Sequence, residues 1–266
     1  MQKIQAAIFD VDGTLFDYHE KKIHASTVTA IRALQERGVT IILASGRSYP
    51  LLGKECLAKI KADYYILSNG HNILDGQFRE IFSKRFSFEQ TEYVVALTRK
   101  YQNGLMLKYP LLNYLYNKPE EMFEVFNNIG LDRTAFVDCL TMNYHQKELP
   151  IGFTLRGSDE IKKALAARGD FRVELFHDES ECDVFCPDVN KMIGLEVLAK
   201  SLKLNPAQCI AYGDSRNDLE MIRWAGLGVA MGNACQELKD AADSVCPASW
   251  ADGIAISISH LLADIF

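Results

Sequence analysis

The sequence predicts an α/β fold, with a doubly wound parallel sheet into which a separate α+β module is inserted. Three observations predict it. Apolar runs alternate with helical patterns up to about residue 83, this texture changes over residues 84–187, and it returns from residue 188 onward. Alternating strand and helix patterns are typical of βαβ units with a parallel sheet. The 266 residues also suffice for two domains of ordinary size.

The first segment contains three predicted strands, at residues 3–9, 39–43 and 64–67. Continuous apolar runs of this length are typical of strands that are buried on both faces. Apolar residues at helical spacing predict one helix that begins at Ser26 and ends at Gly38, and a weaker helix over residues 50–61.

The middle segment has the pattern of an antiparallel α+β module. Helical spacing predicts helices over residues 91–101 and from Pro119 onward. Strand patterns follow at residues 149–155 and 171–175, and the second alternates apolar and charged residues, which indicates a sheet with one solvent-facing side. Five aromatic residues either pack in the core of this module, which we expect, or stack on a substrate ring: Tyr109, Tyr114, Tyr116, Phe123 and Phe126.

The βα pattern returns after Pro187. It predicts helices over residues 193–202 and 217–225 and strands over residues 209–212 and 227–230. We therefore place one α/β core at residues 1–83 and 188–266, and the inserted module at residues 84–187.

Composition and charge exclude several classes of protein. Apolar residues make up 48% and charged residues 24% of the chain, as in globular domains. A net charge of −6 gives no electrostatic reason to bind nucleic acid or a membrane surface. The seven cysteines match no zinc spacing, which predicts free thiols in a reducing compartment. With no signal peptide or membrane span in the pattern, we expect a cytoplasmic protein.

Polar residues follow the predicted strands of the core. They are Asp10 and Asp12 after the first strand, Ser45 after the second, Asn69 after the third, and Asp214 and Asp218 after the first strand beyond the module. In open parallel sheets, ligands bind outside the carboxyl ends of the strands. Clustered carboxylates repel each other unless a proton or a cation lies between them, and such oxygen ligands suit Mg²⁺. Each motif alone could also be a turn or a helix cap.

Four motifs occur along the chain: DVDGTLF at residues 10–16, ASGR at 44–47, NK at 190–191 and GDSRND at 213–218. Together they resemble the haloacid dehalogenase superfamily, in that superfamily's order, and, more narrowly, its Cof-type phosphatases. Shorter matches lie at residues 68–70, 231–234 and 252–255. The resemblance implies a Rossmann-like core, and the inserted module matches the subgroup's type II cap in position and size only.

The resemblance also implies a role for each acidic residue. Asp10 would be the nucleophile that takes the phosphoryl group as an aspartyl-phosphate. Asp12 would be the general acid and then the general base, oriented by Thr14. Asp10, the backbone carbonyl of Asp12, and Asp214 would bind Mg²⁺, with Asp218 supporting the site or the motif lysine.

The residues implied at the substrate or its phosphate are Thr14, Ser45, Gly46, Arg47, Asn69, Lys191 and Asn217. His71 could face the substrate or be a surface-loop histidine. One detail departs from the family pattern, because the motif lysine is commonly followed by glycine, whereas Met192 stands here and Gly194 comes later. Asp12 argues against dehalogenase chemistry, since dehalogenases of this superfamily lack that aspartate.

These observations predict a Mg²⁺-dependent phosphatase that hydrolyses small phosphorylated metabolites such as sugar phosphates. We expect a monomer or a homodimer, with no nucleic-acid or membrane partner. Two alternatives stay open. One is a phosphotransferase, such as a hexose phosphate mutase, and the other is a non-catalytic protein that binds phosphorylated metabolites.

Overall fold

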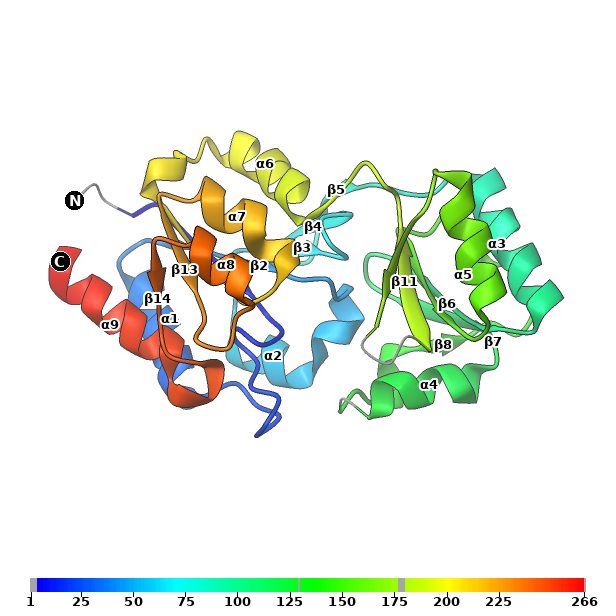
Figure 1. Cartoon of the computed structure of the whole chain (residues 1–266), viewed down its shortest axis with the longest axis horizontal. Coiled ribbons are helices and arrows are strands. Elements are labelled where there is room, and N and C mark those ends of the chain that lie inside the picture. The colour runs from blue at the N-terminus through cyan, green and yellow to red at the C-terminus, as the bar shows by residue number, and fades with distance from the viewer. Residues whose placement is uncertain (1–3, 129, 177–179, 266) are drawn as a thin grey trace. The chain divides into compact units, whose positions relative to one another are not determined.

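A computed structural model describes residues 4–128, 130–176 and 180–265 of the chain (Figure 1). The chain divides into two compact units. The first unit comprises Met1–Gly46, Lys54–Ile81 and Asn190–Phe266, and the second comprises Arg47–Gly53 and Phe82–Val189. The fold is mixed α/β, with a largely parallel sheet in the first unit and a largely antiparallel sheet in the second.

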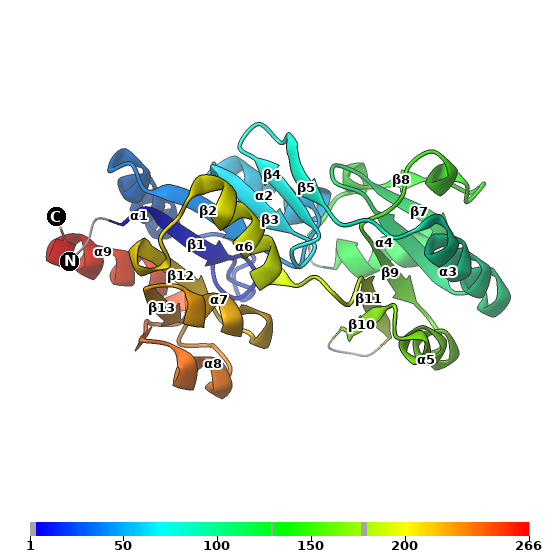
Figure 2. The same cartoon turned by 90° about the horizontal axis from the view of Figure 1, so that it is seen from above.

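The larger sheet has eight strands in the order β14-β13-β12-β1-β2-β3-β4-β5. Their bounds are β1 Ala6–Asp10, β2 Thr40–Ala44, β3 Tyr64–Leu67, β4 Asn72–Asp75, β5 Glu80–Ser83, β12 Cys209–Gly213, β13 Leu227–Ala230 and β14 Ser244–Val245. Neighbouring strands from β14 to β3 run parallel, and β4 pairs antiparallel with β3. Four consecutive strands, β12, β1, β2 and β3, therefore end at the same edge of the sheet (Figure 2).

Helices cover both faces of this sheet. They are α1 Ala25–Glu36, α2 Gly53–Lys59, α6 Lys191–Leu202, α7 Leu219–Trp224, α8 Gln236–Ala241 and α9 Gly253–Ile265. Helices α6 and α7 lie on one face, and α1 and α9 lie on the other (Figures 1 and 2). Helix α1 packs through Val28, Ile31 and Leu34, as its spacing predicts. This arrangement confirms the predicted doubly wound core.

The second unit holds a six-stranded sheet in the order β10-β11-β9-β6-β7-β8. Its elements are α3 Phe88–Tyr101, β6 Gly104–Lys108, β7 Asn113–Asn117, α4 Pro119–Asn127, β8 Val137–Asp138, β9 Gly152–Arg156, α5 Asp159–Arg168, β10 Arg172–Leu175 and β11 Glu181–Phe185. Helices α3 and α5 cover one face of the sheet (Figure 1), where Val94 and Ile161 pack on Leu105 and Phe153.

The alternation at residues 171–175 predicts a solvent-facing side, and in β10 the side chains of Arg172 and Glu174 are partly exposed while Val173 packs on the apolar cluster. Strands β6 and β11 are buried at every position. Lys108 Nζ lies 2.5 Å from Asp183 Oδ2, and Thr154 Oγ1 donates to Asp183 Oδ1 at 2.6 Å. The solvent-facing side therefore does not extend to β6 and β11, because Met106 packs against α4 and Lys108 pairs with Asp183.

The second unit also includes residues 47–53, which come from the N-terminal part of the sequence. Leu51 packs in an apolar cluster with Met106, Leu115 and Met122. The five aromatic residues pack in the two apolar clusters of this unit, as we expected: Tyr109, Tyr114, Tyr116, Phe123 and Phe126.

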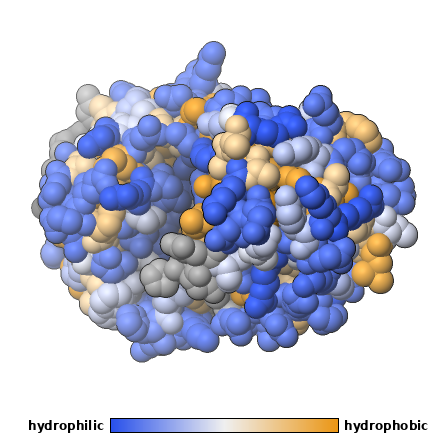
Figure 3. Space-filling model, turned by 45° about the vertical axis from the view of Figure 1, so that its right-hand side comes forward, coloured by the Kyte–Doolittle hydropathy of each residue, from blue (hydrophilic) through white to orange (hydrophobic). Residues whose placement is uncertain are grey.

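The state of the cysteines and the hydropathy of the helices agree with what the composition indicates. All seven cysteines are free thiols. Within the described ranges, no helix is both long enough and apolar enough to cross a membrane. Figure 3 shows a face on which hydrophilic residues predominate and hydrophobic ones form small separate groups.

Candidate active site

Three charged side chains meet, almost fully buried, at the carboxyl ends of β1 and β12. Lys191 Nζ lies 2.7 Å from Asp10 Oδ1 and 2.6 Å from Asp218 Oδ1. Lys191 is the first residue of α6, because the Asn190 side chain caps this helix by accepting from Ile193 N at 2.9 Å. The sheet order thus brings together residues that lie more than 180 positions apart in the sequence.

Burial and mutual charge shift the titration of these groups. Burial raises the pKa of Asp10 well above its usual value, and the charge of Asp218 raises it further, while Lys191 opposes the shift. Burial alone would lower the pKa of Lys191, but the two carboxylates outweigh it, so the net pKa of Lys191 is raised. Lys191 therefore keeps its positive charge although its side chain is almost fully buried.

Asp214 completes an acidic group beside this cluster. Asp10, Asp214 and Asp218 each offer a carboxylate oxygen, all within 4.8 Å of one another. Burial first, and the charge of Asp218 second, raise the pKa of Asp214 to about 7. Asp214 Oδ1 is buried, with no hydrogen-bond partner among the described residues. A buried, unused carboxylate oxygen beside two further carboxylates fits a divalent cation that prefers oxygen ligands, such as Mg²⁺.

The loop after β1 approaches Asp214 closely because it contains Gly13. Gly13 has a φ of +75°, and a Cβ there would lie 2.3 Å from Asp214 Oδ2. Asn233 Nδ2 donates to Gly13 O at 2.8 Å, and the other end of this side chain accepts from Ser249 N. Sequence reasoning gave Asn233 no role, although the motif at residues 231–234 contains it.

Asp12 and Thr14 lie on the same loop. Tyr18 Oη donates to Asp12 Oδ1 at 2.5 Å, a contact that no motif indicated. Thr14 is buried, and its Oγ1 has no hydrogen-bond partner among the described residues. The orienting role of Thr14 toward Asp12 therefore stays a prediction.

The remaining predicted residues divide into two sets. Ser45 follows β2 and is fully buried, and Asn217 Nδ2 donates to Asn69 Oδ1 at 3.2 Å, so these residues lie together in the first unit. Arg47 belongs to the second unit, where its guanidinium donates to Leu51 O at 2.8 Å. His71 is fully buried, so the surface-loop alternative for it is wrong.

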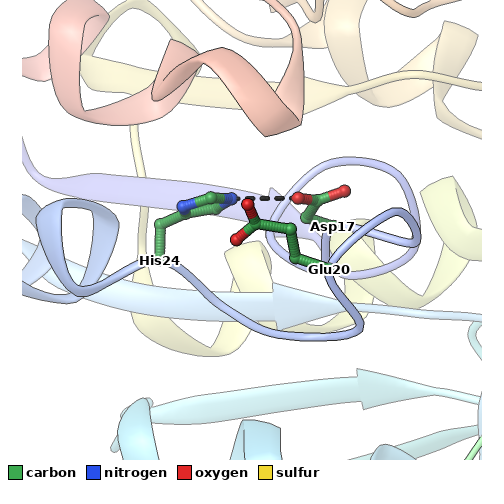
Figure 4. Close-up of side chains that lie close together, drawn as sticks. All are labelled: Asp17, Glu20 and His24. Carbon is green, nitrogen blue, oxygen red and sulfur yellow. Dashed lines mark hydrogen bonds and ion pairs between the residues drawn. The ribbon is translucent and has the colours of Figure 1, made fainter.

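A second group of potential metal ligands lies outside this site (Figure 4). Asp17 is buried; its Oδ1 accepts from His19 N at 2.8 Å, and its Oδ2 lies 3.1 Å from His24 Nε2. Burial raises the pKa of Asp17, but these hydrogen bonds outweigh burial and leave the pKa below its usual value. Glu20 is exposed and pairs with Lys22. Because the Asp17 carboxylate is already bound by its neighbours, we assign this group a structural role in the loop before α1.

Comparisons with known proteins agree on one family. A family model described as haloacid dehalogenase-like hydrolase matches residues 7–258. A Bacillus subtilis protein named as a candidate phosphatase, YkrA, is 31% identical over 257 residues, which cover 95% of this chain and 96% of its own. An HMP-PP phosphatase of Yersinia pseudotuberculosis is 29% identical over 248 residues, which cover 88% of this chain and 85% of its own.

Solved structures share the fold. TM0651 of Thermotoga maritima matches with a TM-score of 0.86 at 21% identity, and the match covers 97% of each chain. The subclass IIB sugar phosphatase BT4131 matches with a TM-score of 0.79 at 24% identity, covering 97% of this chain and 98% of its own.

Proposed function

This chain belongs to the haloacid dehalogenase-like hydrolases and is a phosphatase of their Cof-type branch, and on that premise we propose that it hydrolyses small phosphorylated metabolites with Mg²⁺. One observation carries the proposal: the buried Asp10–Lys191–Asp218 cluster beside the unused oxygen of Asp214. Relatives named as an HMP-PP phosphatase and a sugar phosphatase support a small phosphorylated substrate, and we propose sugar phosphates first.

Mg²⁺ would be held by Asp10, Asp214 and the backbone carbonyl of Asp12. When bound, it offsets the repulsion between the carboxylates and the negative substrate phosphate. Asp218 supports the site without binding the metal, because its Oδ1 already accepts from Lys191 and its Oδ2 accepts from two backbone N–H groups.

In the proposed reaction, a carboxylate oxygen of Asp10 attacks phosphorus and the bond to the leaving oxygen breaks, which leaves an aspartyl-phosphate. Asp12 donates a proton to the leaving oxygen. Water then attacks phosphorus, Asp12 takes a proton from this water, and the Asp10–phosphorus bond breaks to release inorganic phosphate. Both steps are displacements at phosphorus, in which positioning and charge stabilisation account for most of the catalysis.

The phosphoryl oxygens would be held by Ser45, Gly46, Lys191 and Asn217. Lys191 supplies a fixed positive charge, since its buried ammonium is held between two carboxylates. Contacts of Arg47 and Asn69 with the substrate phosphate, and the orienting role of Thr14, stay predictions.

We propose that residues 1–83 and 188–266 form the catalytic core and that residues 84–187 act as a cap, which excludes water and selects the leaving group. The cytoplasmic location and the monomeric or homodimeric state stay predictions.

The test is phosphate release from p-nitrophenyl phosphate and from a panel of sugar phosphates in the presence of Mg²⁺. We expect turnover that EDTA abolishes. Asp10→Asn should remove it and still give a folded protein, with a cooperative urea transition. Asp240→Asn changes an exposed aspartate and serves as the matched control. Full activity of Asp10→Asn would overturn the mechanism.

The same panel separates the alternatives. Transfer of the phosphoryl group to a second sugar hydroxyl, detected by ³¹P NMR, would favour the phosphotransferase. Binding of Mg²⁺ and phosphate by a folded protein that releases phosphate from no compound would favour the non-catalytic binding protein.

A further inference from the structure

The turn after β3 has an unusual backbone. Ser68, Asn69 and Gly70 have φ angles of 50°, 51° and 92°, so three consecutive residues lie in the left-handed region. Residues other than glycine rarely adopt this conformation, although asparagine tolerates it better than most. Such conformations persist where the surrounding structure fixes them.

On one side, this turn fixes the loop that carries Ser45. Asn69 N donates to Ser45 O at 3.1 Å, and Ser45 N donates to Ile66 O at 2.8 Å. Both backbone polar groups of Ser45 are thus bound by β3 and its turn. The Asn69 side chain also packs on Gly46, where a Cβ would lie 3.3 Å from Asn69 Oδ1.

On the other side, the same side chain reaches the loop after β12. Asn217 Nδ2 donates to Asn69 Oδ1 at 3.2 Å. Ser215 Oγ donates to Asn217 Oδ1 at 2.7 Å, and Ser215 N donates to Asp218 Oδ2 at 3.2 Å. A continuous series of hydrogen bonds therefore runs from Asn69 to the carboxylate that holds the motif lysine.

Behind the turn lies the first turn of α6. A Cβ on Gly70 would lie 2.0 Å from Asn190 O, and a Cβ on Gly194 would lie 2.8 Å from Gly70 Cα. The two glycines allow the turn to rest directly on the start of the helix that carries Lys191. Gly194, rather than a glycine directly after the lysine, provides this close approach.

We propose that Asn69 is a positioning residue, which joins the Ser45 loop to the Asn217 loop so that both hold one phosphoryl group in register. The inference rests on the proposed function, because it assumes that these loops bind a phosphoryl group. The Asn69 side chain acts through Asn217, whereas its backbone N–H acts on Ser45. Removing the side chain therefore breaks the contact with Asn217 and leaves the backbone hydrogen bond to Ser45 intact.

A double-mutant cycle tests this coupling. Asn69→Gly removes the carboxamide and suits a positive φ, and Asn217→Ala removes the donor. We expect Asn69→Gly to lower kcat for p-nitrophenyl phosphate by about 10- to 100-fold, as small displacements of catalytic groups do, and to change KM much less. In the Asn217→Ala background, Asn69→Gly should lower kcat no further, since coupled residues are not additive.

Ser68→Gly is the matched control. It changes the adjacent residue of the same turn, also at positive φ, whose Oγ has no hydrogen-bond partner among the described residues. Its kcat should equal that of the wild type. A loss of kcat in Ser68→Gly as large as that in Asn69→Gly would overturn the inference, because any change in the turn would then have the same effect.

Failure of the inference is distinguishable from failure of the proposed function. If the wild type is active and Asn69→Gly lowers kcat by the same factor with and without Asn217, the positioning role is wrong and the function stands. If the wild type hydrolyses nothing, the proposed function is wrong. The double-mutant cycle is then measured as the affinity of each variant for inorganic phosphate in the presence of Mg²⁺, by calorimetry. Additive losses of affinity, or no binding by the wild type, then overturn the inference as well.

Discussion

Replacing Lys191 by methionine removes the positive charge from the buried cluster at the end of β1. Methionine keeps most of the volume of the side chain, so the change tests charge and not packing. The lysine side chain is fully buried and lies 2.7 Å from Asp10 Oδ1 and 2.6 Å from Asp218 Oδ1. The variant therefore leaves two buried carboxylates without their cation.

The magnitude follows from these distances. At an effective dielectric constant of about 20, each contact contributes about 6 kcal/mol of Coulomb attraction. Desolvation of the three ions costs several kcal/mol per ion and offsets most of this gain. In the variant the attraction is lost while the carboxylates stay buried, so we expect the free energy of unfolding to fall by about 3–5 kcal/mol.

On the proposed function, activity should fall as well, since the positive charge proposed to hold the phosphoryl oxygens is gone. Loss of one such stabilising group lowers kcat by about 10²- to 10³-fold. Urea unfolding and phosphate release with Mg²⁺ measure the two effects. Lys200→Met, at an exposed position near the end of the same helix, is the control and should change neither. A loss of less than about 1 kcal/mol, as for an exposed ion pair, with kcat within tenfold of the wild type would refute this reasoning.

Three further predictions follow from the contacts above. Gly194→Ala should lower the free energy of unfolding by about 1–3 kcal/mol, because the new Cβ would lie 2.8 Å from Gly70 Cα. This loss should outweigh the gain of about 1 kcal/mol that alanine gives over glycine in an open helix. A thermal midpoint above that of the wild type would contradict this. Lys108→Met should destabilise the second unit by about 3–5 kcal/mol, as measured by hydrogen exchange in β6. Replacing Asp183 by leucine in the same protein should restore most of this loss. A double variant less stable than Lys108→Met alone would refute the pairing. The pKa of Asp17 is lower in the folded protein than its ordinary 3.8, so the ionised carboxylate stabilises the fold above about pH 4 and this stabilisation is lost as the pH falls further. Urea titrations should therefore show that the difference in unfolding free energy between wild type and Asp17→Asn shrinks below about pH 4. A difference that stays constant with pH would argue against the shift.

The core strands of the first unit could be predicted because they are continuous apolar runs. β2 and β3 lie within one residue of their predicted bounds, and β1 begins three residues later than predicted. In the second unit, β6 and β11 gave no usable pattern, because Lys108 and Asp183 stand at buried positions and are paired there. Periodicity detects a solvent-facing side, and it fails where a paired charge takes the place of solvent.

Other predicted elements were displaced as well. The strand expected at 149–155 occupies Gly152–Arg156, and the helix expected at 50–61 begins as a 3₁₀ turn at Tyr49–Leu52 before α2. Element ends depend on caps and tertiary packing, which a periodic pattern does not contain.

The candidate site was predictable to the extent that its residues follow strands. Asp10, Ser45 and Asp214 could be placed at one sheet edge from the strand pattern alone. The contact of Lys191 with Asp10 could not, because it depends on the order β12-β1-β2 and on the packing of α6. Tyr18 was not predicted either, since a tyrosine in a loop gives no signal until its hydroxyl is seen on Asp12.

The pairing of β1 with β12 has a consequence for the order of synthesis. Ala6 lies opposite Cys209, 203 positions later in the chain, so β1 is synthesised long before β12, although its other neighbour, β2, follows it closely. Every strand of the second unit is made within that interval. Domains generally fold as units during synthesis. The N-terminal strands of the larger sheet cannot complete it until β12, β13 and β14 have been synthesised. We therefore expect the second unit to be complete in the nascent chain before β12 can pair with β1.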